Sequence, residues 1–209
     1  MSELTDVHAA NPAPARPLRL TGAKPPLKPK QVWAVRDRLQ LAKRTRDLAL
    51  FDLGIDSKLR GCDLVALRIA DIALNRRVQS RAAIIQRKTG RPVQFELTEQ
   101  TRGSVNAWFV AMGDTPSEYV FPSRANRSGH LSTRQYARLL REWMTLIGLD
   151  RCAYGTHSLR RTKASLIYKR TGNLRVVQLL LGHTKLESTV RYLGIEVDDA
   201  LTISEQTEI

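Results

Sequence analysis

The chain has 209 residues and a formal net charge of +14, from 34 lysines and arginines against 20 aspartates and glutamates. With 42% hydrophobic residues it can bury one substantial core, which excludes a wholly disordered chain. The positive charge is typical of a nucleic-acid-binding protein, but a basic RNA-binding structural protein would carry the same excess, so charge alone does not decide the chemistry.

The distribution of residues argues against a disulfide-rich protein and against a membrane-spanning one. Cys62 and Cys152 lie far apart with no metal-ligating neighbours, which predicts reduced thiols rather than a disulfide framework. No apolar run approaches the length of a membrane span, and the N-terminus has no hydrophobic signal core. We therefore expect a cytoplasmic protein with no membrane contact.

The chain begins with a proline-rich segment. Residues 1–29 hold six of the nine prolines and no periodic apolar pattern, which predicts a flexible basic tail. Its second half could lie along DNA, but its composition favours a solvated linker. A single domain is expected over residues 30–193, followed by an acidic segment, 194–209.

Apolar spacing predicts helices and strands in the first half of this domain. Helical spacing is found over Lys30–Leu41, Asp47–Leu53 and Arg60–Arg68. Three extended runs follow, at Ile69–Ile72, Ala82–Gln86 and Val93–Leu97, and residues 88–91 between the last two have the composition of a turn. These runs predict a three-stranded antiparallel sheet.

The second half is mainly helical. Long periodic segments cover Thr98–Met112 and Thr133–Ile147, and Glu118–Pro122 is a short extended piece between them. Asn173 can cap a helix over Leu174–Leu181 that Gly182 ends, and residues 184–187 read as a capping box that starts the next helix. The predicted fold class is mixed α/β, mainly α-helical with one small sheet.

One stretch of the second half concentrates phosphate-handling side chains. It contains H-S-L-R at 157–160, L-G-H at 181–183 and V-R-Y at 190–192. Arg160 offers a planar fork of donors that matches phosphate oxygens, and it shares a helix face with His157. Tyr192 follows His183 by nine residues. Together these residues could hold a phosphodiester and attack it with a phenol.

These motifs resemble the catalytic domain of the tyrosine recombinases, also called the phage integrase family. Two further elements support the resemblance, which spans about Lys30 to Leu201. Leu59-Arg60 leads into G-C-D-L-V-A-L-R-I-A-D-I, similar to the family's G-L-R-x-x-E-L-x-x-L-x-x-x-D-I, and Lys88 lies in the turn Q-R-K-T-G-R-P. The family glycine two residues before the arginine is replaced here by Lys58.

The resemblance implies the tyrosine recombinase catalytic-domain fold and cleavage of DNA through a 3′-phosphotyrosine, without ATP, metal or other cofactor. Tyr192 would be the nucleophile, because Tyr154 and Tyr168 are nearby but do not follow L-G-H. The other roles would fall as follows: Arg60 and Arg160 clamp the phosphate, His157 accepts the tyrosine proton or holds the phosphate, His183 donates to a non-bridging oxygen, and Lys88 protonates the leaving 5′-oxygen.

The resemblance also carries expectations about partners. Most family members have an additional N-terminal DNA-clamping domain, whereas only a short tail precedes Lys30, as in the small bacterial recombinases that invert promoter segments. We expect double-stranded DNA as substrate and a tetramer on DNA, and an accessory DNA-binding protein is a further candidate partner. The acidic segment 194–209 could dock on a neighbouring protomer or stay disordered. Two alternatives stay open: a catalytically silent DNA-binding regulator of the same fold, and a basic structural nucleic-acid-binding protein.

Overall fold

The computed structural model describes residues 24–124, 129–195 and 205. Most of the predicted N-terminal tail and almost all of the acidic C-terminal segment lie outside these described residues. Across the described part of the chain, no helix is long and apolar enough to span a membrane.

Nine helices are found in the described residues, and four of them match the bounds expected from the sequence within about one residue. Their bounds are α1 Pro29–Leu41, α2 Thr45–Ser57, α3 Gly61–Val65, α4 Ile69–Ile72, α5 Glu99–Met112, α6 Thr133–Leu146, α7 Thr156–Thr171, α8 Leu174–Leu181 and α9 Leu186–Leu193. The Asn173 side chain accepts a hydrogen bond from the Val176 N–H and caps α8 as predicted.

The capping box predicted at residues 184–187 is wrong. Helix α9 begins one residue later than that motif requires, with Lys185 in the capping position and no side-chain capping bond. The Thr184 carbonyl instead accepts a hydrogen bond from the Gln178 side chain at 3.2 Å. The short link between α8 and α9 is therefore fixed by a contact back to α8.

The predicted three-stranded sheet is corrected to two separate two-stranded sheets. Strands β1 (Ala73–Leu74) and β2 (Arg77–Val78) form one, and β3 (Arg81–Ile85) and β4 (Pro92–Glu96) form the other. Residues Ile69–Ile72 are one turn of helix because the Asp71 carboxylate accepts a hydrogen bond from the Arg68 N–H at 2.8 Å. An apolar run this short does not distinguish strand from helix by periodicity.

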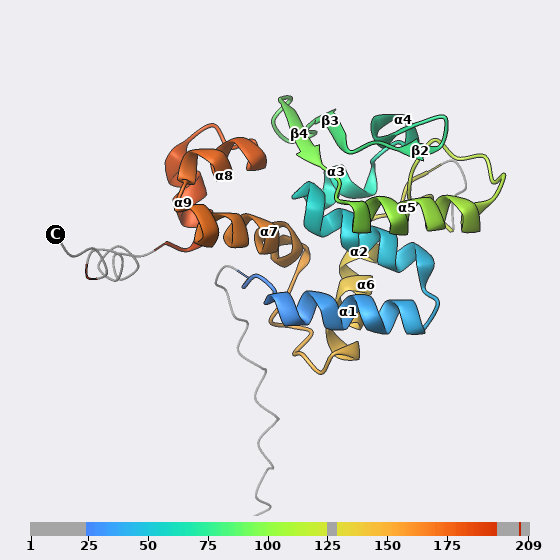
Figure 1. Ribbon diagram of the computed structural model, residues 1–209, viewed down its shortest axis with the longest axis horizontal. Helices are drawn as coiled ribbons and strands as arrows, with labels where there is room; N and C mark the ends of the chain where they lie inside the picture. Colours follow the sequence, from blue (N-terminus) through green and yellow to red (C-terminus); the bar gives the residue numbers. More distant parts are fainter. Residues whose placement is uncertain (1–23, 125–128, 196–204, 206–209) are drawn as a thin grey trace, which may run out of the picture.

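Helix α2 is the centre of the main core. From Asp47 to Ser57 all its residues except Leu48 are buried, and it packs against α1, α5 and α7 (Figure 1). Helices α7, α8 and α9 enclose a second, smaller cluster built on Ala164, Val177 and Leu181. The hairpin of β3 and β4 spans the two parts, because β4 contacts both α2 and α8.

The end of the predicted flexible tail packs on the domain. Leu27 is buried in the main core, and its N–H donates to the Thr162 hydroxyl of α7 at 2.9 Å. The Lys24 carbonyl accepts a hydrogen bond from the Arg161 guanidinium. The ordered domain therefore begins at least six residues before Lys30.

Candidate active site

Five of the six side chains singled out from the sequence converge where the main core meets the α7–α9 unit. Arg60 precedes α3, His157 and Arg160 lie in the first turns of α7, His183 links α8 to α9, and Tyr192 is near the end of α9. These residues are far apart in the chain, and they are brought together because α2 packs on α7 and α7 packs on both α8 and α9.

Arg160 is the most buried of the group, with 2% of its surface exposed. Its Nη2 donates to the Leu181 carbonyl, the last residue of α8, at 2.7 Å. Its Nη1 is buried and has no hydrogen-bond partner among the described residues. Burial lowers its pKa, opposed by the nearby Tyr192. A buried guanidinium with a free donor is costly unless an anion arrives to accept from it.

Gln86 connects the two candidate arginine clamps. Its Oε1 accepts from Arg60 Nη1 at 2.6 Å, and its Nε2 donates to the same Leu181 carbonyl that Arg160 uses, at 3.3 Å. A Cβ added to Gly182, which has φ +64°, would stand 2.9 Å from Gln86 Nε2. The glycine is therefore required both by its left-handed backbone and by the close approach of this amide.

The candidate nucleophile packs among cationic and aromatic side chains. The Tyr192 ring lies edge-to-face with His183, with ring centroids 5.4 Å apart, and the Arg161 guanidinium stands 4.6 Å from its centre. Its hydroxyl donates to the His157 carbonyl at a long 3.4 Å. His183 Nδ1 is in turn 3.1 Å from the buried Thr189 hydroxyl, which fixes the orientation of the imidazole.

Desolvation and positive charge shift the titration of this group. Burial, together with Arg160 and Arg60, lowers the pKa of His183 to about 4. Although the His157 side chain reaches solvent, partial desolvation and the neighbouring cations also lower its pKa. Both imidazoles are therefore neutral near pH 7. Burial raises the pKa of Tyr192, and the adjacent guanidiniums oppose that rise.

Lys88 is the one predicted site residue that lies apart from the other five. It is exposed at the turn between β3 and β4, and its charge contributes to lowering the pKa of His157. The turn is anchored below it, because the buried Asp63 carboxylate accepts from the Arg87 N–H at 2.9 Å. The hairpin is thus fixed to α3, which follows Arg60, while the lysine side chain extends into solvent.

A comparison with protein-family models finds the phage integrase family over residues 27–197. The chain belongs to this family. A relative described as "Probable integrase/recombinase YoeC" from Bacillus subtilis (strain 168) is 31% identical over 76% of this chain and 82% of its own length. "Tyrosine recombinase XerD" of Caulobacter vibrioides is 28% identical over 76% of this chain and 55% of its own length. The chain thus spans about half the length of this second relative.

Solved structures of the phage integrase family share the fold. The crystal structure of the XerA recombinase matches with a TM-score of 0.71 at 21% identity, covering 87% of this chain and 64% of that one. The XerH site-specific recombinase, bound to a palindromic difH substrate in a post-cleavage complex, matches with a TM-score of 0.69 at 18% identity, covering 88% and 54%. The described helices and hairpins are therefore those of the family's catalytic-domain fold.

Lys58, which occupies the position of the family glycine, belongs to a buried cluster of charged side chains. Lys58 ends α2 in the left-handed conformation (φ 53°), which explains why glycine suits this position elsewhere. Its Nζ donates to the Asp56 carbonyl at 2.6 Å and to both Glu96 carboxylate oxygens at 2.9 and 3.0 Å. Lys163 of α7 lies 2.7 Å from both carboxylates, those of Asp56 and Glu96.

This cluster was missed from the sequence because Asp56 and Lys58 lie far along the chain from Glu96 and from Lys163, and none of the four belongs to a recognised motif. It ties together the segment before Arg60, strand β4 of the hairpin and helix α7 one turn after Arg160. The only signal was the lysine in the glycine position. Within the described residues, no three His, Cys, Asp or Glu side chains form a group that could hold a metal ion, and the expectation of metal-free chemistry stays a prediction.

Proposed function

We propose that this chain is a site-specific recombinase that cleaves and rejoins DNA strands through a phosphotyrosine at Tyr192. The observation that carries the proposal is the buried Arg160 guanidinium, which has a free Nη1 and no carboxylate within ion-pair distance among the described residues. Arg60 lies close by, joined to it through Gln86 and the Leu181 carbonyl. This is a site prepared for an anion, and a DNA phosphodiester suits the net charge of +14.

The arginines would supply electrostatic stabilisation. A phosphodiester repels nucleophiles, and negative charge builds on its non-bridging oxygens as phosphorus becomes pentavalent. Arg60 and Arg160 would each donate to one of these oxygens, and the neutral His183 would donate its Nε2 proton to one as well. The hydrogen bond between His183 Nδ1 and Thr189 would hold the ring in position.

The remaining groups would move protons. The Tyr192 oxygen forms a bond to phosphorus while the bond from phosphorus to the 5′-oxygen breaks. The phenol proton passes to His157, whose lowered pKa leaves it neutral and able to accept near pH 7. Lys88 gives a proton to the departing 5′-oxygen, which its place on an exposed turn allows it to reach. Attack by a 5′-hydroxyl reverses every step, so rejoining needs no ATP.

Double-stranded DNA is the proposed substrate, and self-association to a tetramer on DNA the proposed working form. Support comes from the fold: XerH is bound to its difH substrate, and a lambda integrase fragment matched here is a dimer bound to a core site. The position and orientation of the DNA sites that the protein recognises would decide between integration, excision and inversion.

The test is the capture of the covalent intermediate. Duplexes selected from a random pool by binding to the protein are nicked at successive positions, so that the fragment with the free 5′-hydroxyl is lost after cleavage. We expect a protein–DNA adduct on a denaturing gel, mapped to Tyr192 by peptide analysis and absent in Tyr192→Phe. Tight binding with no adduct at any nick, or an adduct that survives Tyr192→Phe, would overturn the proposal.

A further inference from the structure

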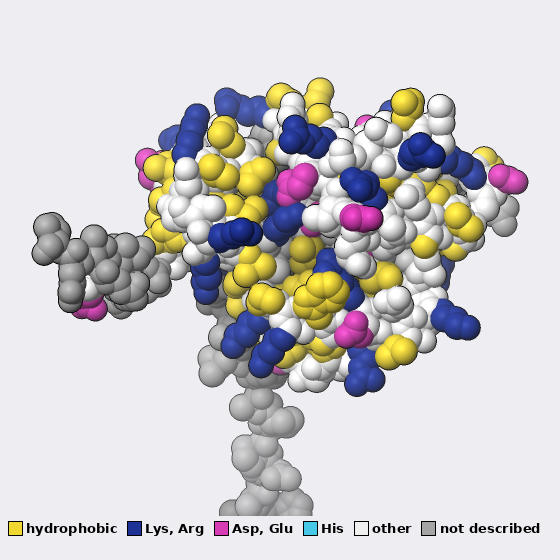
Figure 2. Space-filling model, in the orientation of Figure 1, with side chains coloured by type: hydrophobic (Ala, Val, Ile, Leu, Met, Phe, Trp, Pro, Cys, Tyr) yellow, Lys and Arg dark blue, Asp and Glu magenta, His cyan; other side chains and the backbone are white. Residues whose placement is uncertain are grey.

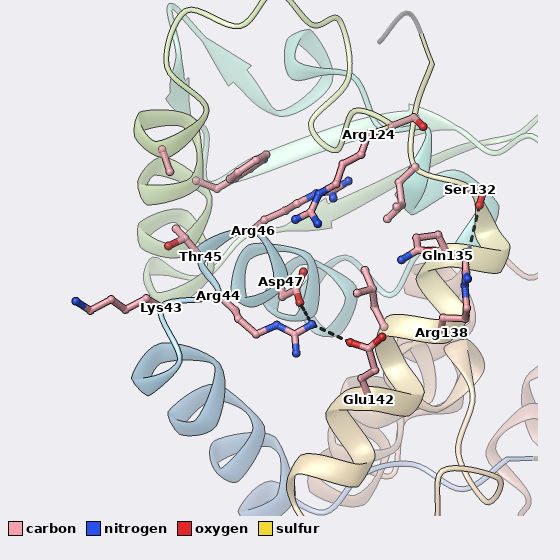
Figure 3. Close-up of a pocket in the computed structure, with 15 residues that line it drawn as sticks. Lys43, Arg44, Thr45, Arg46, Asp47, Arg124, Ser132, Gln135, Arg138 and Glu142 are labelled. Carbon is pink, nitrogen blue, oxygen red and sulfur yellow. Dashed lines mark hydrogen bonds and ion pairs between the residues drawn. The ribbon is translucent and has the colours of Figure 1, made fainter. Parts of the chain in front are cut away.

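A basic hollow lies at the opposite end of α2 from the candidate active site. It has a volume of about 750 Å³ and is lined by the turn before α2, the first half of α6 and the residues Ser123 and Arg124 (Figure 3). Five of its lining residues are cationic, and two are acidic. The cationic ones are Lys43, Arg44, Arg46, Arg124 and Arg138.

Both carboxylates of the hollow form ion pairs with the same cation. Arg44 forms ion pairs with both Asp47 and Glu142, the latter at 3.0 Å. No carboxylate of the described residues forms an ion pair with Arg46, Arg124 or Arg138. Five cations against two carboxylates leave the lining of the hollow with a formal net charge of +3.

Two of the guanidiniums without an ion pair extend into the same hollow. Figure 3 shows the Arg46 and Arg124 side chains converging from opposite walls. Arg46 is held in place because its Nη2 donates to the Pro122 carbonyl at 2.7 Å, while its buried Nε has no partner among the described residues. Burial and the charge of Arg124 lower its pKa. The Asp47 carboxylate opposes this effect, and an anion bound between the two guanidiniums would further reduce their mutual repulsion.

The hollow continues toward the active site. A second hollow on the other part of α6 shares Arg44, Arg138 and Glu142 with the first and ends at His157. Each hollow has five lysines and arginines, two of which are shared, so eight line the combined groove against two carboxylates. Helix α6 has 14 residues and is about 21 Å long, which corresponds to about six base pairs of duplex.

We propose that the hollow between Arg46 and Arg124 binds a backbone phosphate of the same DNA duplex whose scissile phosphate lies at Arg160. Arg46 would be the fixed donor and Arg124 the exposed one that closes on the phosphate, with Arg138 contacting the strand between the two sites. The occupant follows from the net positive charge of the hollow, from the buried Arg46 Nε that has no partner among the described residues, and from the neighbouring hollow that includes His157. This inference rests on the proposed function for the identity of the anion.

The experiment measures binding alone and is done in the Tyr192→Phe background, so that it does not depend on cleavage. The affinity for a fluorescent 30-base-pair duplex is measured by anisotropy over a series of KCl concentrations. Removing one phosphate contact lowers the slope of log K against log salt by about 0.9. We expect this loss for Arg124→Gln and again for Arg138→Gln, with affinity at 0.1 M salt reduced about fivefold by each.

Arg76→Gln is the matched control, because it removes the same charge from an exposed arginine in the turn between β1 and β2, outside both hollows. Its slope should stay at the parent value. An unchanged slope in Arg124→Gln, or an equal change in Arg76→Gln, would overturn the site. Absence of a covalent adduct in the test of Tyr192 would leave this result standing, so the two proposals fail separately.

Discussion

Replacing Gly182 by alanine tests whether Gln86 sets the geometry of the two arginine clamps. The new Cβ would stand 2.9 Å from Gln86 Nε2 and 3.2 Å from Oε1, closer than van der Waals contact allows. The amide would have to move, although Arg60, Thr89 and the Leu181 carbonyl hold it by hydrogen bonds. We therefore expect Gly182→Ala to displace Arg60 from its position.

The expected magnitude has two parts. An L-residue in the left-handed conformation at φ +64° costs about 1–2 kcal/mol, which appears as lower stability. Displacing the amide disrupts its bond to the charged Arg60, worth about 1.5–3 kcal/mol in place. If the displacement of Arg60 reduces the stabilisation of the transition state by about 1.4 kcal/mol, adduct formation slows about tenfold.

Gly172→Ala separates these two parts. Gly172 ends α7 with φ +63°, and a Cβ there would meet nothing within 4 Å, so only the backbone strain is shared. Both variants should lose a similar free energy of unfolding in urea, and both should bind duplex DNA like the parent. Single-turnover adduct formation should fall only in Gly182→Ala. Equal rates for the two variants would show that Gln86 does not position the site.

Three other predictions concern the groups around the site. The pKa of His183 is lower in the folded state than in the unfolded chain, so the unfolded state binds more protons and the protein loses stability as the pH falls from about 6.5 toward 4. His183→Asn should therefore lose less stability over that pH interval, as measured by urea unfolding at each pH. In the buried cluster, Lys58→Met and Glu96→Gln should each destabilise the fold, by about 2 kcal/mol. Their effects should be non-additive by at least about 0.5 kcal/mol, because either single change already removes the ion pair between Lys58 and Glu96, although Glu96 keeps its contact with Lys163; an additive double variant would contradict the ion pair. Asp63→Ala should free the hairpin and slow adduct formation several-fold at unchanged DNA affinity, whereas Asp63→Asn, which keeps the acceptor for the Arg87 N–H, should stay near the parent rate.

Most of the fold could be predicted from the sequence because its long helices carry strong apolar periodicity and local stop signals. Helices α1, α5, α6 and α8 begin and end within about one residue of the expected bounds, and Asn173 caps α8 as expected. The error at Ile69–Ile72 has a local cause, since the hydrogen bond that the Arg68 N–H donates to the Asp71 carboxylate favours a helical turn in a four-residue apolar run.

The sequence by itself identified five residues that the fold brings together, because histidine, arginine and tyrosine occur at the spacing of the family motifs, whereas the predicted Lys88 lies apart from them. Only the tertiary structure decided how they are held. Arg60 and Arg160 are joined through Gln86 and the Leu181 carbonyl, and Lys58 is neutralised by Glu96 from another element. The close approach of the Arg46 and Arg124 side chains is also created only by the fold. Such contacts join residues that lie tens of positions apart, and a charge is known to be unpaired only once all its neighbours are in place.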